Sequence, residues 1–501
     1  MVTMNRRRLS RRMLLLQGTA VAGVTVVLAA CGETKPEPVA ATAAPAATAA
    51  PKAVTTVAAP AVTTAAVAPQ KGILQINYST DHTTGARGKA TQWGLEKFAQ
   101  LEPNILVKVV HRPGGEQPIL LASGAAPEVL LGNQFVFTGF LASGAYVKIT
   151  DMAKKHADKF QVDWNALYFL PDLYTDNKWD HSFPPPGKIT GDMYGMSFQP
   201  AINGWLYNVS MFEAGGVTAP TADWTWNNVE EVGKKLTDDA KKVFGMAPPN
   251  SSEFGWLPLM YSNGLKKYLN DDLTHTPFDE PAAMEAIAWA IGTVHKFKIA
   301  YNPNDAKALQ GEFGSPFVAG KAGMWPTGLQ GVGNQVTQIG ARFKWSLMPS
   351  PKSPKTNKAG HGWNDQPYLV TRASSRLGVE EEATKLVLFL GGQIYQGRVG
   401  IDRGHVPNNR KTLAEAATLA APPEGLGIWK ANMDQCDNRH LYPFDSLSEW
   451  QGAAFGPMDK GFTGDLAPDA VGPAMAKAGD VILAARTSTL KPTFAKYDCA
   501  K

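Results

Sequence analysis

Polar side chains that directly follow two predicted strands are the first candidates for chemistry in this chain. Asp81 and His82 follow the first predicted strand, and Asn133 and Gln134 follow the third. Carboxylate, imidazole and amide groups can bind the hydroxyl groups of a small molecule by hydrogen bonds. An aspartate in this position is more often a turn residue or a helix cap than a ligand contact, and both the structural and the ligand-binding interpretation stay open for Asp81.

Tryptophans form the second group of candidates, and all 13 lie after residue 71. Aromatic rings cover the apolar faces of a pyranose, while polar groups bind its hydroxyl edge. Trp256 is flanked by a glycine, Trp325 ends a predicted apolar strand, and Trp363-Asn364-Asp365 is predicted to form the polar approach to another strand. The alternative for each tryptophan is burial in the core, where large apolar side chains usually lie.

Motifs of the main enzyme classes are missing from the sequence. It contains no GxSxG, HExxH or P-loop pattern, and Gly331-Val332-Gly333 lacks a third glycine at the spacing of a dinucleotide-binding turn. The nine histidines include no i,i+4 pair, and His361 and His405 are predicted in loops, so no metal site is expected. A secreted glycosidase stays the enzymatic alternative, because its paired carboxylates need not be close in sequence. The sequence otherwise predicts a binding protein without a cofactor.

The amino-terminal segment accounts for the whole excess of positive charge. The 501 residues include 49 Lys+Arg and 44 Asp+Glu, and five arginines fall within the first twelve residues. Without residues 1–30, the chain has 44 basic and 44 acidic residues, which gives no indication of a nucleic-acid partner. A basic start, an apolar run and a small-residue exit predict an export signal over 1–30. The segment Ser10–Leu15 resembles a twin-arginine signal, and the general secretory route is the alternative.

Cys31 follows Leu28-Ala29-Ala30, and this ending resembles a bacterial lipobox. In a lipobox the cysteine thiol receives a diacylglycerol and becomes the mature amino terminus. An uncleaved membrane anchor is the alternative, because the 18-residue apolar run could just span a bilayer. Residues 31–71 are mostly Ala, Pro, Thr and Val, so they are predicted to hold the lipidated cysteine and a disordered tether.

The body that follows the tether predicts an α/β fold. Strands are expected at 73–78, 105–109 and 128–131, separated by a helix that ends at Leu101 and by a second helix over 116–123. This β-α-β-α-β order implies a parallel sheet with helices on both faces. Ligands bind such sheets at the carboxyl ends of the strands, which is where the polar candidates lie.

Further along the chain, 192–208 is predicted to form paired extended segments. A helix is expected to run from Thr225, as its N-cap, to about Leu236, and another is expected to carry Pro281 in its first turn. Residues 380–399 are predicted to form one long helix with an acidic first turn.

Six segments, taken together, resemble extracellular solute-binding protein family 1, the sugar-binding lipoproteins of ABC importers. Glu128 stands where the family usually has Asp, Met196-Ser197-Phe198 departs from the usual Leu-Pro, and Tyr368-Leu369 replaces Trp-Ala. No single motif is specific, but the segments follow the family's order over about 300 residues. They are 93–110, 121–130, 193–216, 224–236, 317–325 and 360–370.

The resemblance implies a periplasmic-binding-protein-like fold, with two α/β lobes joined by a hinge and a ligand cleft between them. It also implies aromatic ligand contacts in the loops near Trp325 and Trp363. Gln199 joins the candidates because it lies beside the first expected crossing between lobes, at Pro200. The other crossings are expected near Pro349 and His405. The expected lobes are 72–200 plus 350–405, and 201–349 plus 406–501.

The resemblance further implies a protein that captures a sugar or oligosaccharide by hinge closure. Its partners would be an ABC permease with its ATPase, and its lipid would anchor a monomer to the outer face of a bacterial membrane. The same fold could instead bind glycerol phosphate, an amino-acid derivative or a polyamine, and an anionic solute would need a cation such as Arg87 or Arg112. Cys436 and Cys499 are predicted either to form a disulfide or to stay unpaired.

Overall fold

The computed structural model describes most of the chain after residue 71. Residue contacts divide the chain into Met1–Val67 and Ala68–Lys501, and every described residue belongs to the second unit. The predicted export signal, Cys31 and the tether therefore lie outside the described residues. Those residues are 72–111, 116–132, 140–141, 143–164, 166–167, 173–175, 178–180, 192–270, 272–434, 447–486 and 492–493.

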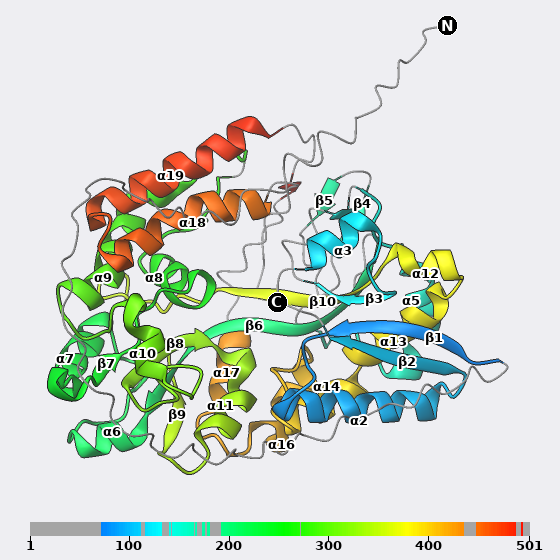
Figure 1. The fold of residues 1–501 in the computed structure, drawn as a ribbon, viewed down its shortest axis with the longest axis horizontal. Coiled ribbons are helices and arrows are strands. Elements are labelled where there is room, and N and C mark those ends of the chain that lie inside the picture. The colour runs from blue at the N-terminus through cyan, green and yellow to red at the C-terminus, as the bar shows by residue number, and fades with distance from the viewer. Residues whose placement is uncertain are drawn as a thin grey trace, which may run out of the picture. The chain divides into compact units, whose positions relative to one another are not determined.

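The described strands form two sheets, of which the larger passes through the middle of the molecule (Figure 1). Its strand order is β2-β1-β3-β10-β6-β8-β7, with β9 also paired to β6, and the smaller sheet has the order β11-β5-β4. The strands are β1 (Leu74–Thr80), β2 (Ile105–His111), β3 (Val129–Leu131), β4 (Leu173–Thr175), β5 (Lys178–Asp180), β6 (Gly195–Asn208), β7 (Phe244–Met246), β8 (Ala322–Gly328), β9 (Trp345–Met348), β10 (Trp363–Val370) and β11 (Pro492–Thr493).

Helices cover both faces of the larger sheet (Figure 1). Those of the first half are α2 (Gly85–Leu101), α3 (Gln117–Ser123), α5 (Thr150–His156), α6 (Val209–Ala214), α7 (Trp226–Leu236), α8 (Leu257–Ser262) and α9 (Pro281–His295). Those of the second half are α10 (Ala306–Gln310), α11 (Val332–Ile339), α12 (Arg372–Leu377), α13 (Glu380–Gly391), α14 (Gln393–Ile401), α15 (Arg410–Ala414), α16 (Ala416–Leu419), α17 (Gly427–Met433), α18 (Leu447–Thr463) and α19 (Pro468–Ala485). None of the helices within the described ranges is both long and apolar enough to span a membrane.

The predicted β-α-β-α-β unit is confirmed. β1 pairs in parallel with β2 and with β3, and α2 and α3 form the connections. β1 extends two residues beyond its predicted end, because Ser79 and Thr80 pair with Val110 and His111. The helix expected after Thr225 is also confirmed, and the backbone N–H of Thr225 donates to Asn228 Oδ1 at 2.8 Å. Pro281 begins α9, as predicted.

Residues 192–208 do not form two segments paired with each other, so that prediction was wrong. β6 is one strand of 14 residues. Its first part pairs with β10 and its last part with β8 and β9, all antiparallel. All three partner strands come from distant parts of the chain, which local residue patterns cannot reveal. Pro200, the first expected crossing, lies inside this continuous strand opposite Asp365.

The single long helix predicted over 380–399 was also wrong. α13 ends at Gly391 and α14 begins at Gln393, because Gly392 adopts an extended conformation with ψ of 162°. A Cβ at Gly392 would lie only 2.2 Å from the carbonyl oxygen of Phe160. Glycine therefore allows the backbone to approach Phe160 where the helix changes direction.

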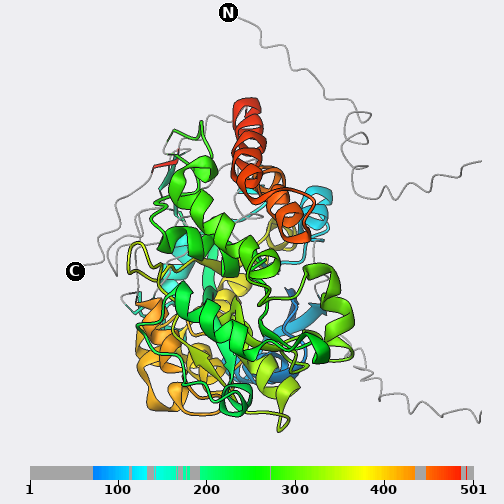
Figure 2. The same cartoon turned by 90° about the vertical axis from the view of Figure 1, so that its left-hand side faces the viewer.

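Buried apolar side chains of the described residues form four clusters, which we group by chain segment into two cores. The first core consists of two clusters drawn from 76–198 and 368–399, and the larger of them includes residues of β1, α2, β10 and α13. The second core consists of two clusters drawn from 202–348 and 406–483. In one of them, α18 and α19 pack against each other and against α9 (Figure 2). The predicted assignment of whole segments to two lobes follows the same grouping and stays a prediction.

Candidate functional site

The carboxyl ends of β1 and β8 lead into two turns that contact each other. After β1, residues 81–84 lead into α2; after β8, a short 3₁₀ turn, η6 (Leu329–Gly331), leads into α11. α2 packs against α11. We call residues 81–87 and 329–335 the facing turns. Ligands of α/β proteins bind at the carboxyl ends of strands, so the facing turns are the candidate site.

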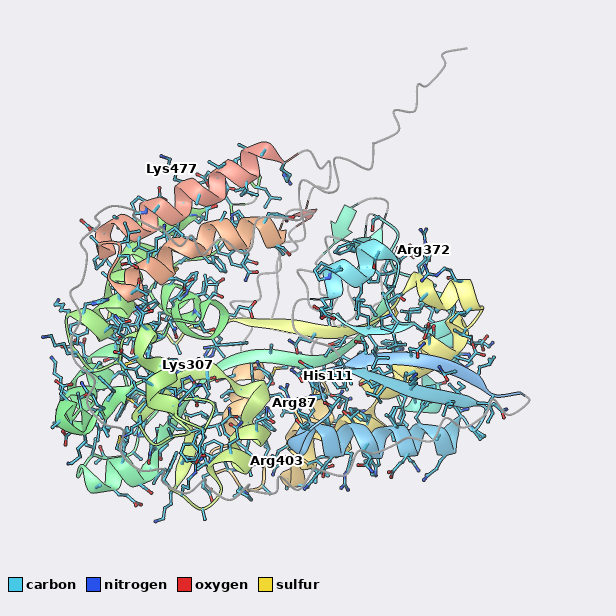
Figure 3. The ribbon with its side chains drawn as sticks, in the orientation of Figure 1. Arg87, His111, Lys307, Arg372, Arg403 and Lys477 are labelled. Atoms are coloured by element: carbon cyan, nitrogen blue, oxygen red, sulfur yellow. The ribbon has the colours of Figure 1, made fainter. Side chains whose placement is uncertain are left out.

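Arg87 connects the facing turns directly. Its Nη2 donates to the carbonyl oxygen of Gln330 at 3.0 Å, and its Nε donates to that of Gly404 at 3.1 Å. Figure 3 shows Arg87 between α2 and α11. Burial lowers the pKa of Arg87 from its ordinary value, and the nearby Asp81 carboxylate opposes that effect. Arginine stays protonated in proteins, so the guanidinium keeps a positive charge at this position.

The predicted candidates Asp81 and His82 both lie in the first facing turn. Asp81 is exposed, whereas the His82 side chain is buried. The backbone N–H of His82 donates to Thr80 Oγ1 at 3.0 Å, and His82 Nε2 lies 3.3 Å from Asp81 Oδ1. The ring centroid of His82 lies 5.6 Å from that of Phe198. A direct contact of either residue with a ligand stays a prediction.

A row of buried hydroxyl groups lies at the end of β1. Tyr78 Oη donates to Tyr368 Oη at 2.5 Å, and Tyr368 Oη donates to Thr80 Oγ1 at 3.0 Å. Burial raises the pKa of both tyrosines, so both phenols stay protonated at neutral pH. These bonds fix β1 against β10, which holds the end of β1 in place. Tyr368 is about 290 residues from Tyr78 and Thr80 in the chain, so the sequence did not predict these hydrogen bonds.

His405 lies close to the same turn and is fully enclosed, although the sequence placed it in a loop without indicating burial. Its side chain is 1 % exposed, and its ring centroid is 4.4 Å from that of Phe198 and 6.1 Å from that of His82. Its Nδ1–H donates to the carbonyl oxygen of Val406 at 2.8 Å, while Nε2 has no hydrogen-bond partner among the described residues. Burial, together with the charge of Arg87, lowers the pKa of His405 to about 3, although the hydrogen bond to Val406 opposes this shift. His405 is therefore neutral at physiological pH.

We expect His405 to make the protein less stable in mild acid. In the unfolded chain its pKa returns to the ordinary value, so the unfolded state gains a proton below about pH 6.5 and the folded state does not. Between pH 7 and pH 5 this difference should remove about 2 kcal/mol from the free energy of unfolding. Urea unfolding at both pH values, compared with His405→Phe, isolates the effect. An equal loss in the variant would contradict it.

Neutral amide oxygens without partners lie at and near the facing turns. Gln330 Oε1 and Gln335 Oε1 are buried in the second facing turn and accept no hydrogen bond from any described residue. Gln199 Oε1, on β6, is also buried and accepts no hydrogen bond from any described residue, while Gln199 Nε2 donates to Gln366 Oε1 at 2.7 Å. Buried acceptors cost free energy unless a donor reaches them, so ligand or solvent hydroxyl groups fit here.

Of these amides, the sequence singled out only Gln199. Gln330 and Gln335 were missed because the strand-end rule was applied only to the first strands of the chain. Applied to the apolar segment that contains Trp325, the same rule would have pointed to Gln330. Gln366 had no local signal, since its position is defined by its register opposite Gln199.

The two predicted tryptophan candidates of the second core differ in burial. Trp256 is 2 % exposed and packs edge-on against Phe455, with ring centroids 4.8 Å apart. Trp325 is half-buried and lies 5.5 Å from Phe317 between ring centroids. The prediction that Trp325 ends its strand was wrong. β8 continues through Pro326 to Gly328, where it is paired with β6. Ligand contact of either ring stays a prediction.

Trp363, Asn364 and Asp365 do not form a polar approach to a strand, so that prediction was wrong. They are part of β10 and pair with Ile202, Ala201 and Pro200. Antiparallel pairing with β6 extends the strand to these residues despite their polar character. Their side chains lie outside what the structure describes. The other sequence candidates outside the described residues are Asn133, Gln134, Arg112, Cys436 and Cys499.

Two surface grooves lie elsewhere, beside α3 and α12. Their volumes are about 420 and about 520 Å³, and Arg376 lines both. None of the predicted site residues lines either groove. Within the described ranges, no group of three or more His, Cys, Asp or Glu side chains could hold a metal ion.

Comparison with known proteins places this chain among solute-binding proteins. Residues 79–396 match the family described as bacterial extracellular solute-binding protein. A protein of Brucella abortus (strain 2308) is 22 % identical over 234 residues, which is 46 % of this chain and 54 % of that protein. The chain thus spans about half the length of this curated relative.

Solved structures with similar folds cover nearly the whole described body. An ABC substrate-binding protein from Listeria monocytogenes in complex with cycloalternan is 22 % identical, with a TM-score of 0.66 over 82 % of this chain and 97 % of its own. A maltose/maltodextrin-binding domain from Bdellovibrio bacteriovorus bound to maltotriose is 17 % identical, with a TM-score of 0.63 over 82 % and 100 %. Both likenesses show a two-lobe α/β fold of the periplasmic-binding-protein type. Because the family match covers more than half of its residues, this chain belongs to the bacterial extracellular solute-binding proteins.

Proposed function

We propose that this protein captures a sugar or oligosaccharide outside the cytoplasm and delivers it to an ABC permease and its ATPase. The observation that carries the proposal is the contact between the facing turns, which present buried amide acceptors without partners. Hydroxyl groups of a sugar are the donors that such acceptors need. The sugar ligands of proteins with the same fold support this choice.

The charges around the facing turns favour an uncharged solute. The Gln330 and Gln335 amides are neutral, and His405 is held neutral by burial. Arg87 is a cation, but two backbone carbonyl oxygens already accept its hydrogen bonds. A strongly anionic solute such as glycerol phosphate would need more positively charged hydrogen-bond donors than these residues offer.

We further propose that the protein binds its sugar without hydrolysing it. The family and the proteins of similar fold are binding proteins. A glycosidase would place two carboxyl groups about 5–10 Å apart at the bound sugar. Asp81 is the carboxylate that the facing turns contain. Release of a cleaved glycoside, lost in Asp81→Asn, would instead favour the hydrolase.

We expect at least one sugar in a broad panel to raise the melting temperature. The panel should include maltotriose and cycloalternan, because a ligand at 100 times its Kd stabilises a protein by about 2.7 kcal/mol. Gln335→Ala should raise the Kd for that sugar about tenfold, since it removes one hydrogen-bond acceptor from the site. Gln338→Ala on the exposed side of the same helix is the matched control and should leave the Kd unchanged. No shift with any sugar would refute the sugar assignment.

We also propose a lipid anchor at Cys31 after removal of the twin-arginine signal. The support is the sequence Leu28-Ala29-Ala30-Cys31 after a basic and apolar leader, and the extracellular family fits this location. An anchor at the end of the 31–71 tether would keep a monomeric binding body near its permease. Incorporation of labelled palmitate into the wild type, and its loss in Cys31→Ser, tests the anchor.

A further inference from the structure

We propose that Arg87 is a positioning residue that holds the facing turns together and so sets how readily the two lobes separate. Its role rests on the proposed function only where sugar affinity is concerned. The hydrogen bonds themselves are independent of what the protein binds.

The two ends of this connection belong to different cores. α2 carries Arg87 and contributes Ala90 and Phe98 to the first core. Leu329 and Val332, on either side of Gln330, are buried in the second core. The bond from Arg87 Nη2 to the Gln330 oxygen therefore joins one core to the other. A planar guanidinium has a fixed fork geometry, so a small shift of either turn misaligns the bond.

The helices approach closely at the same place because glycine stands between them. A Cβ at Gly333 would lie 2.0 Å from the carbonyl oxygen of Arg403 and 2.9 Å from the Cβ of Ala86. A Cβ at Gly85 would lie 3.5 Å from Asn334 Oδ1. Contact between α2 and α11 is thus possible only with a minimal side chain at Gly333.

Opening of the lobes must break the bond between Arg87 and Gln330. The second bond of Arg87, to Gly404, lies beside the expected third crossing at His405 and can persist during opening. Arg87 consequently favours the conformation in which the turns meet. A ligand that binds between the turns benefits from every increase in the population of that conformation.

Hydrogen exchange in the sugar-free, full-length protein tests this directly. In Arg87→Met, amides of 329–339 should exchange at least about tenfold faster, because the charged hydrogen bond to Gln330 is lost together with the bond to Gly404. Arg87→Lys should restore part of the protection. Lys89→Met, on an exposed position of the same helix, should exchange like the wild type. Exchange should rise more at the facing turns than in the rest of the protein, and more than the change in the urea midpoint accounts for, which separates positioning from general destabilisation.

A steric variant provides an independent check. Gly333→Ala should increase exchange in both facing turns, whereas Gly397→Ala has open space around its Cβ and should not. With maltotriose as the probe, Arg87→Met should raise the Kd about tenfold. Unchanged exchange in both Arg87→Met and Gly333→Ala would overturn the proposal. If the wild type binds no sugar, the proposed function fails, yet the exchange measurement still decides the role of Arg87.

Discussion

Replacing Arg403 with methionine is expected to lower the free energy of unfolding by about 4 kcal/mol. Arg403 is only 9 % exposed, and its guanidinium donates hydrogen bonds to four backbone carbonyl oxygens. Its Nε donates to Pro422 O at 3.2 Å, and Nη1 donates to Gly400 O at 2.7 Å and to Thr418 O at 2.9 Å. Nη2 donates to Ala420 O.

The expected loss is large because methionine fills the space but supplies no donor. Several buried carbonyl oxygens would then lack a partner, and each such group costs about 1–3 kcal/mol. Their costs are not additive, since the 418–422 segment can move toward water. Burial also lowers the pKa of Arg403, because it desolvates the charged guanidinium, and the nearby Asp402 carboxylate opposes this shift.

Urea unfolding of Arg403→Met should be compared with Arg398→Met on the preceding helix. Arg398 is half-exposed, and its Nε donates to Asp402 Oδ2 at 2.7 Å in an i,i+4 pair. Such surface pairs contribute at most about 0.5 kcal/mol. Arg403→Lys should fall between the two, because one ammonium cannot reach all four oxygens. Similar losses at Arg398 and Arg403 would show that the carbonyl oxygens around Arg403 do not stabilise the fold.

Replacing Trp256 with alanine should have an effect of comparable size, about 3–5 kcal/mol. The ring is 2 % exposed and packs edge-on against Phe278 and Phe455, with centroid distances of 5.9 and 4.8 Å. Alanine removes these contacts and leaves a cavity in the second core. We expect the variant to have a lower free energy of unfolding in urea. We do not expect a selective loss of sugar affinity.

Trp256→Phe distinguishes core packing from ligand contact. Phenylalanine keeps most of the apolar contact, so stability and sugar affinity should both change little. Trp93→Ala on the half-buried face of α2 is the matched control and should lose less stability. A stable Trp256→Phe protein with strongly reduced sugar affinity would support the original interpretation of Trp256 as a ligand residue.

The early part of the fold could be predicted because its signals are local. Two apolar runs, separated by a segment with helical periodicity, define β1, α2 and β2 within 40 residues, and parallel pairing follows from the connecting helices. Later errors have equally specific causes. β6 is stabilised by three strands from distant segments, and β8 continues through Pro326 because of its pairing with β6. Gly392 interrupts a helix to allow contact with Phe160.

The sequence by itself determined the family, the α/β class and one side of the candidate site. Asp81 and His82 follow a recognisable strand, and this order along the chain places them in a turn at its carboxyl end. Only the tertiary structure brought Gln330 to Arg87, which lies 243 residues away in the chain. It also enclosed His405 and so lowered its pKa. Burial and contacts between distant segments depend on how two cores pack around β6, and no local pattern of residues encodes that packing.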